Sequence, residues 1–420
     1  MPDLILFRVG LKSSLYRFLL LAFSLFFVAG NFFRFLTLGF FQSNFSLAEM
    51  GLYAIALPLY FAKRRRSQWI VFAILVSGLY GVILHRFDLS SLFYGAKAVG
   101  MIASGVVIGD ALWRQYGDQL EAAIWFFLRL FLGVLIIGAA IYLAFPKAMD
   151  FFALLGKFGI HFHGDPHVKR FISPFFDPNY YAVIATIPLI LLLIFPKKRK
   201  GISSLSFLLL VSILLSWSRG GIATCLATLT ISSVVLWCYG KRGGFKPRVL
   251  IYLMVFVPLI GGILFFVRTE LGVFAERLFE IGEDQSAYAR FENLSEALYF
   301  FKEYPFWGVG FNYLPKLFLE KWGFVGIDSS LLTLLCCFGL VPTLGFLLCG
   351  AIWFLKRVRS YFNLRKSHPF LFRAFWALSI YLGVCSFFTS WLINLWSYPY
   401  WLIPMIALFT YLDRNILIAK

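Results

Sequence analysis

Two short polar stretches in an otherwise apolar chain carry residue types suited to binding an anion. Arg170 precedes Asp177-Pro178-Asn179 by seven residues, and Ser218-Arg219-Gly220-Gly221 follows about forty residues later. An arginine can hold phosphate oxygens through two parallel hydrogen bonds. Charged groups at membrane depth are costly and are usually kept for function. Arg170 and Arg219 are therefore predicted to be catalytic residues that clamp an anionic substrate.

Both stretches have a structural alternative. Asp177-Pro178-Asn179 is typical of a helix start, with Asp177 as the cap and Pro178 in the first turn. The cap is the stronger interpretation of Asp177, although Asp177 and Asn179 are both candidates for substrate binding. Arg219 could instead extend to lipid headgroups. The two glycines that follow it favour function, because they allow a sharp turn and the close approach of a ligand.

A third polar stretch, Asp328-Ser329-Ser330, begins a later apolar segment. Asp328 could accept a proton from an attacking hydroxyl or hold an acceptor sugar, and Ser329 is a candidate for substrate binding. The same residues could simply cap a helix. A free aspartate has a pKa of about 4, so Asp328 is a weak base unless burial raises its pKa.

Other charged residues give weaker signals. Arg290 lies on an expected amphipathic helix, where it could bind substrate or face solvent. Lys97 lies within an apolar segment, near the end that is expected to face outside. Its side chain could reach the cavity in which the arginines are predicted to bind substrate. His161, His163 and His167 have no carboxylate or thiolate partner that completes a familiar metal signature. No metal site is predicted.

Composition places the chain in a membrane. Of its 420 residues, 60% are hydrophobic and only 14% are charged, which is typical of an integral membrane protein. The formal net charge of +19 could suggest nucleic acid, but the basic residues lie in short clusters beside apolar runs, and no basic domain is present. This is the positive-inside pattern. The clusters are 63–66, 197–200, 241–248 and 356–366.

Hydropathy predicts an all-α fold with about twelve transmembrane helices. If the N-terminus is cytoplasmic, every strong basic cluster follows an even-numbered segment, so both termini lie on the cytoplasmic side. The segments are 16–33, 46–62, 68–84, 92–112, 122–145, 179–195, 202–217, 220–239, 249–267, 329–355, 370–393 and 396–412.

The same count of segments from a cytoplasmic N-terminus places two longer loops on the outer side. The whole chain, 1–420, is expected to form a single polytopic domain. The loop at 146–178 is the first long periplasmic loop, and the larger loop at 268–328 is expected to form an outer cap. The larger loop carries an amphipathic helix that either lies on the membrane or covers a cavity. Tyr304-Pro305 is expected to end this helix. Its apolar positions are Phe291, Leu294, Leu298 and Phe301.

Taken together, these stretches carry a resemblance to a known family. From about residue 165 to 340, the chain resembles the bacterial O-antigen ligase and polymerase superfamily. The order and spacing of the motifs are more specific than any one of them. The matching residues are Arg170 with Asp177-Pro178-Asn179, Ser218 to Gly221, Arg290 followed by Tyr304 to Gly310, and Asp328 to Leu331 followed by Gly339.

The resemblance implies a glycosyltransferase with a GT-C-like architecture. The expected donor is a glycan on undecaprenyl diphosphate, and the acceptor is another glycan or a glycolipid. Arginines would stabilise the leaving diphosphate without a metal or other cofactor, with Arg290 as a third substrate-binding residue. Membrane lipids and a chain-length regulator are the further partners it suggests, and the bacterial inner membrane is the localisation it implies.

The chain departs from the family pattern at two places, and these bear on whether it belongs with the polymerases or with the ligases. The family often has glycine where this chain has Ser173. Ligases of the family usually carry a His-Asn pair where this chain has Asp328-Ser329, which favours a polymerase and keeps a ligase as the alternative. A lipid-linked oligosaccharide flippase is the alternative of another class. It predicts an internal repeat and charges along the middle of many helices, and neither is evident.

Overall fold

The computed structural model describes most of the chain as helices. The described residues are 2–35, 47–63, 67–145, 147–157, 170–195, 202–239, 285–314, 316–318, 330–363, 367–388 and 398–419. Within these ranges, every secondary-structure element longer than two residues is a helix. The predicted segment at 249–267 lies outside the described residues.

The helices follow the predicted apolar segments closely. α3 has the predicted bounds, and most of the others differ by a few residues at their ends. The elements of the first half are α1 (Pro2–Ala29), η1 (Gly30–Phe35), α2 (Leu47–Phe61), α3 (Gln68–Leu84), α4 (Ser90–Tyr116), α5 (Leu120–Ala144) and α6 (Ala148–Gly156). Those of the second half are α7 (Pro178–Leu193), α8 (Ile202–Leu215), α9 (Arg219–Tyr239), α12 (Gln285–Glu303), α14 (Ser330–Phe338), α15 (Leu340–Asn363), α16 (Pro369–Phe388) and α17 (Tyr398–Ala419).

Several of these helices could cross a membrane. In the described part of the chain, five are long and apolar enough by length and composition, at 14–32, 90–116, 120–144, 340–362 and 369–386. Five shorter apolar helices accompany them. The chain is an all-α, multi-pass membrane protein.

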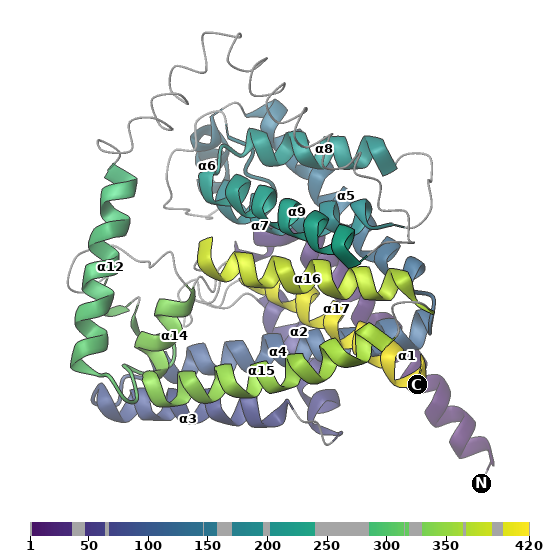
Figure 1. Cartoon of the computed structure of the whole chain (residues 1–420), viewed down its shortest axis with the longest axis horizontal. Coiled ribbons are helices and arrows are strands. Elements are labelled where there is room, and N and C mark those ends of the chain that lie inside the picture. Colours follow the sequence, from purple (N-terminus) through teal and green to yellow (C-terminus); the bar gives the residue numbers. More distant parts are fainter. Residues whose placement is uncertain are drawn as a thin grey trace.

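α4 is a central helix of the bundle and packs against α17, α3, α2 and α1. Small residues make the approach of α17 possible. A Cβ atom at Gly105 would lie 2.6 Å from Cβ of Ile406, and one at Gly109 would lie 2.6 Å from Cβ of Thr410. Small residues at helix contacts serve this purpose in membrane bundles. Most helices run in one general direction, whereas α12 stands across it (Figure 1).

The predicted segment at 329–355 is two helices rather than one. α14 ends at Phe338, α15 begins at Leu340, and Gly339 between them has a φ of 75°, which favours glycine. The turn after α12, at 304–310, forms four backbone hydrogen bonds with residues on both sides of the break at Gly339. The N–H groups of 309 and 310 donate to the carbonyls of 336 and 337, and those of 340 and 341 donate to the carbonyls of 305 and 306.

These bonds explain why the helix can break there. A helix end leaves backbone groups without partners inside the helix, and the 304–310 turn supplies partners on both sides of the break. A Cβ atom at Gly339 would lie 2.3 Å from the carbonyl carbon of Phe306. The sequence pattern gave no sign of this contact, because the segment is apolar throughout.

We expect Gly339→Ala to destabilise the protein by about 2 kcal/mol or more, because alanine is strained at this φ and its methyl group would displace the 304–310 turn. Gly345→Ala is the matched control, since nothing lies within 4 Å of a Cβ atom there and alanine favours a helix. Thermal unfolding in detergent measures both. Equal midpoints for the two variants would contradict the prediction.

The two expected outer loops contain helices. The first holds α6, which the sequence did not predict. The second holds α12, which ends before Tyr304-Pro305 as predicted. In the part of α12 whose side chains the structure describes, Ala297 and Phe300 are buried, whereas Leu294 and Leu298 are each 43% exposed. Leu294 and Leu298 are therefore open to contact with the membrane, which is one of the two predicted placements of this helix.

Candidate functional site

Arg170 lies at the junction of the two polar stretches that the sequence singled out. Its Nε donates to the carbonyl oxygen of Ser216 at 2.8 Å, and its Nη2 donates to Oδ1 of Asn179 at 3.0 Å. The neighbouring N–H of Phe171 donates to the carbonyl of Leu215 at 2.9 Å. Arg170 is 9% exposed. The structure thus places the Arg170 stretch beside the residues that lead into the Ser218-Arg219 stretch.

A tight turn at 173–176 leads from Arg170 to α7. Ser173 and Phe176 have φ values of 53° and 61°, in the left-handed region. This conformation gives a physical reason for the glycine that the family often has at position 173. Here the serine hydroxyl accepts a hydrogen bond from the N–H of Phe175 at 3.2 Å, which offsets part of the strain.

Aromatic packing holds this turn in place. Phe175 contacts Phe27 edge-on and stacks on Tyr400, with centroid distances of 5.8 and 5.0 Å. Phe176 lies among rings of α6 and η1. Asn31 donates through Nδ2 to the carbonyl of Phe175 at 2.5 Å and through its backbone N–H to the carbonyl of Pro174 at 2.9 Å. Arg170 is therefore anchored on a rigid support.

Asp177 caps α7. Its carboxylate accepts from the N–H groups of Asn179 at 2.7 Å and Tyr180 at 3.1 Å, and Pro178 occupies the first helical position. The cap interpretation of Asp177 is confirmed. This geometry also fixes Asn179, whose side chain receives Arg170.

The first turn of α9 lies beside the first turn of α7. Ser218 precedes it, and the Ser218 hydroxyl accepts from the N–H of Gly221 at 3.0 Å. A Cβ atom at Gly221 would lie 2.3 Å from Cβ of Ala182, so this glycine permits the close approach of α7 and α9. Arg219 is the first residue of α9; its side chain lies outside the described residues.

This arrangement favours an anion. The starts of α7 and α9 lie side by side, and the N-terminal end of a helix carries partial positive charge. The Arg170 guanidinium is held beside both starts. A guanidinium is always charged, and its planar set of N–H donors suits the oxygens of a phosphate.

Lys97 is buried and forms an ion pair. Its Nζ lies 3.0 Å from Oε2 of Glu49, and the two side chains are 3% and 4% exposed. The pair joins α4 to α2 inside the bundle. Sequence analysis left Glu49 without a role, although an acid and a base in apolar segments are the expected signal of such a pair. Substrate binding by Lys97 stays a prediction.

A second polar cluster clamps the α3–α4 connection to the segment after α12. His85 stacks on Tyr313 with centroids 3.6 Å apart and hydrogen-bonds the carbonyl of Val309 through Nε2 at 2.8 Å. Asp88 accepts from the Tyr313 hydroxyl at 2.8 Å and pairs with Lys316. We call these residues, His85, Asp88, Tyr313 and Lys316, the outer clamp. Sequence analysis did not find it, because His85 and Asp88 lie about 225 residues before Tyr313 and Lys316.

The outer clamp should be sensitive to acid. Partial burial by itself raises the pKa of Asp88, but hydrogen bonds from Lys316, Ser90 and Tyr313 outweigh it and hold the pKa well below its ordinary value. A lowered folded pKa contributes stability that is present at neutral pH and is lost as the pH falls below about 4.

We expect Asp88→Asn to lower the unfolding midpoint at pH 7, with a cost below about 1 kcal/mol because the carboxylate is partly exposed. The difference from the wild type should shrink as the pH falls to 3. Thermal unfolding in detergent across this range measures it. In a Lys316→Met background the substitution should have a smaller effect, and a difference that grows in acid would contradict the assignment.

Several predicted site residues lie outside the described part of the chain. These are Asp328, Ser329, the three histidines at 161, 163 and 167, and the side chain of Arg290. α14 begins directly after Ser329, and α12 carries Arg290 and packs on α14. Within the ranges that the structure describes, no three His, Cys, Asp or Glu side chains gather as for a metal ion.

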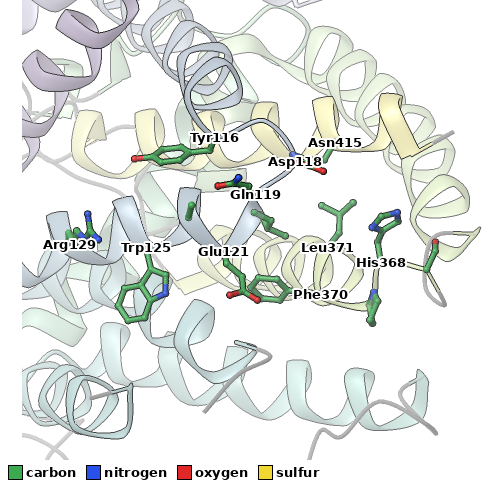
Figure 2. A pocket seen from close by; sticks show the side chains of 14 residues that line it. Tyr116, Asp118, Gln119, Glu121, Trp125, Arg129, His368, Phe370, Leu371 and Asn415 are labelled. Atoms are coloured by element: carbon green, nitrogen blue, oxygen red, sulfur yellow. The ribbon is translucent and has the colours of Figure 1, made fainter. Parts of the chain in front are cut away.

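A cavity of 1130 Å³ lies elsewhere in the molecule (Figure 2). It is lined by the connection between α4 and α5, the start of α16 and Asn415 of α17. α5 runs from this cavity at Leu120 to Gly138, where a Cβ atom would lie 3.1 Å from Cα of Ser173. The α5 residues that line the cavity end at Arg129, nine residues or about 14 Å before Gly138, so the cavity lies toward the other end of α5 from the turn that carries Arg170.

Comparison with known proteins supports the resemblance found in the sequence. Residues 204–347, about a third of the chain, match the family model described as O-antigen ligase. This stretch contains Arg219, Arg290, Asp328 and Gly339, whereas Arg170 precedes it. No curated protein matches the chain. The resemblance to the O-antigen ligase and polymerase superfamily is confirmed over the matched residues.

Proposed function

We propose that the protein is a membrane glycosyltransferase that polymerises oligosaccharide repeat units carried on undecaprenyl diphosphate. The observation that carries the proposal is the contact of Arg170 with Asn179 and Ser216 at the adjoining starts of α7 and α9. A cation fixed beside two helix N-termini suits a diphosphate leaving group. The family match at 204–347 supports a glycan substrate.

In the proposed reaction, an acceptor hydroxyl attacks the anomeric carbon of the donor as the bond to the diphosphate breaks. Attack from the opposite face inverts the configuration. Arg170 and Arg219 stabilise the negative charge that develops on the departing diphosphate. Asp328 takes the proton of the hydroxyl, Ser329 and Arg290 bind substrate, and no metal is required.

The proposed topology places this chemistry on the periplasmic side of the bacterial inner membrane. About twelve spans, in a GT-C-like arrangement, bring both termini to the cytoplasm. The basic clusters support this orientation, because Lys63 and Arg414 both pair with Asp110 near the end of α4. The 146–178 and 268–328 regions are then the periplasmic loops.

A ligase that transfers finished glycan to a lipid acceptor is the second candidate, and the description of the matched family favours it. The polymerase is preferred because Asp328-Ser329 stands where ligases usually carry His-Asn. A flippase for the same substrate remains the candidate of another class. A chain-length regulator is the proposed partner of a polymerase.

The experiment that separates these functions is a gel of surface glycolipid together with a lipid-linked glycan extract from a deletion strain. A polymerase predicts loss of the long ladder, with single repeats still attached to the anchor. A ligase predicts long glycan that accumulates on undecaprenyl diphosphate. An unchanged pattern in both samples would contradict the proposed function.

We expect Arg219→Ala to abolish polymer in the complemented strain while the protein is still made at normal levels. Arg219→Lys should rescue poorly, because an ammonium group cannot bind a phosphate bidentately. The polymer ladder and an immunoblot of the membrane fraction measure the two effects. Full activity in Arg219→Ala would remove this residue from the mechanism.

A further inference from the structure

The cavity at the far end of the bundle has walls of both charges. Asp118 and Glu121 lie at the start of α5, and Arg129 lies two turns further along the same helix. The ring of Trp125 lies between Glu121 and Arg129, and Tyr116 faces them from α4 (Figure 2). The site therefore offers hydrogen-bond acceptors at one end, a cation at the other, and aromatic rings between them.

The two carboxylates of the cavity add to the acidic groups at this end of the molecule. At the same end, Lys63 and Arg414 pair with Asp110 and Arg357 pairs with Asp413, so these basic residues already have acidic partners other than Asp118 and Glu121. The positive-inside pattern does not require acids at such a surface. Asp118 and Glu121 are thus suited to a ligand group that carries positive charge.

Arg129 is suited to a negatively charged ligand group that lies deeper in the membrane than Asp118 and Glu121. It is the tenth residue of α5, a helix of 25 residues that is apolar enough to span a membrane, and its side chain is exposed. A cation at such a depth is costly unless it meets an anion, water or a lipid headgroup. Because it lines the cavity, the cavity gives it access to such a partner.

The order of these charges matches the headgroup of an aminophospholipid. In a bilayer leaflet, the phosphate lies nearer the hydrocarbon and the ammonium nearer the water. Glu121 and Arg129 are eight residues apart, about 12 Å along the helix. Long side chains on a helix lean toward its N-terminus, so Glu121 and Arg129 lean in the same direction and their charges keep about this separation.

We propose that this cavity binds the headgroup of a zwitterionic aminophospholipid, with its phosphate at Arg129 and its ammonium at Asp118 and Glu121. Trp125 and Tyr116 add cation–π attraction to the ammonium. The ligand is part of the surrounding membrane, so the site holds a structural lipid on the side of the bundle away from Arg170. This inference does not depend on the proposed glycosyltransferase activity.

The test compares three phospholipids on the delipidated, full-length protein in detergent. Phosphatidylethanolamine has the phosphate and a hydrogen-bonding ammonium, phosphatidylcholine has a methylated ammonium without N–H donors, and phosphatidylglycerol has no amine. We expect phosphatidylethanolamine to raise the unfolding midpoint most. Equal stabilisation by all three lipids, or a larger effect of either other lipid, would overturn the proposal even if no variant could be purified.

Variants then assign the contacts. In native mass spectra of the wild type, bound phosphatidylethanolamine should exceed phosphatidylglycerol, and Asp118→Asn with Glu121→Gln should reduce that preference about tenfold, the scale of one charge-assisted hydrogen bond. Arg129→Gln should weaken the binding of both lipids. Glu303→Gln at the end of α12 is the matched control and should change neither. A double variant that keeps the wild-type preference would overturn the assignment.

Discussion

Arg170→Gln is expected to reduce glycan transfer by a factor of about 100 to 1000, the usual cost of removing a fixed electrostatic donor from a reaction site. The substitution removes the charge together with the bonds to the Ser216 carbonyl and the Asn179 side chain. The measurement is the initial rate of repeat-unit polymerisation by membranes that contain equal amounts of each variant.

Arg170→Lys separates charge from geometry. Lysine keeps the positive charge but cannot reproduce the planar fork that contacts both partners, so we expect less than a tenth of the wild-type rate. Arg86→Gln removes an exposed cation from the α3–α4 connection and is the matched control. A wild-type rate for Arg170→Gln would contradict the proposed site, and an equal loss for Arg86→Gln would show a general effect of charge.

We expect Asn179→Ala to reduce glycan transfer, but by less than Arg170→Gln. Arg170 would keep its bond to Ser216, so the guanidinium should stay near its position but lose part of its orientation. Asp177 would still cap α7, because its carboxylate accepts from the backbone N–H of 179. A loss of activity without a change in unfolding midpoint would support an orienting role for Asn179.

Lys97→Met is expected to destabilise the protein by about 3 to 5 kcal/mol, because it leaves the buried Glu49 carboxylate without its cation. The double variant Lys97→Met with Glu49→Gln should recover most of that loss, since it removes both charges. Thermal unfolding in detergent and the amount of folded protein in the membrane measure the effect. Additive losses in the double variant would contradict a coupled pair.

The same double variant tests the predicted substrate role of Lys97. If Lys97 binds substrate, a folded double variant should lose glycan transfer. Transfer at the wild-type rate would restrict Lys97 to its structural contact with Glu49. Because the double variant keeps the side-chain volumes similar, the comparison isolates charge from packing.

Sequence alone determined the class of the molecule and most of its elements. Hydropathy located α3 and most other helices to within a few residues, because a lipid environment requires long apolar segments whose backbone bonds are satisfied internally. The polar residues stood out against that background, so Arg170 and Arg219 could be selected as candidates, and the Asp177 cap could be predicted, from residue type and spacing. The amphipathic helix and its end before Tyr304-Pro305 followed from periodicity and proline chemistry.

Only the tertiary structure decided how these residues meet. The contact of Arg170 with Ser216, the pairing of Lys97 with Glu49 and the outer clamp join positions that are far apart in the chain, and one sequence does not encode which polar groups become neighbours. The break at Gly339 was hidden for a related reason. Its cause is a set of backbone hydrogen bonds and a close approach from Phe306, and backbone groups are the same in every residue.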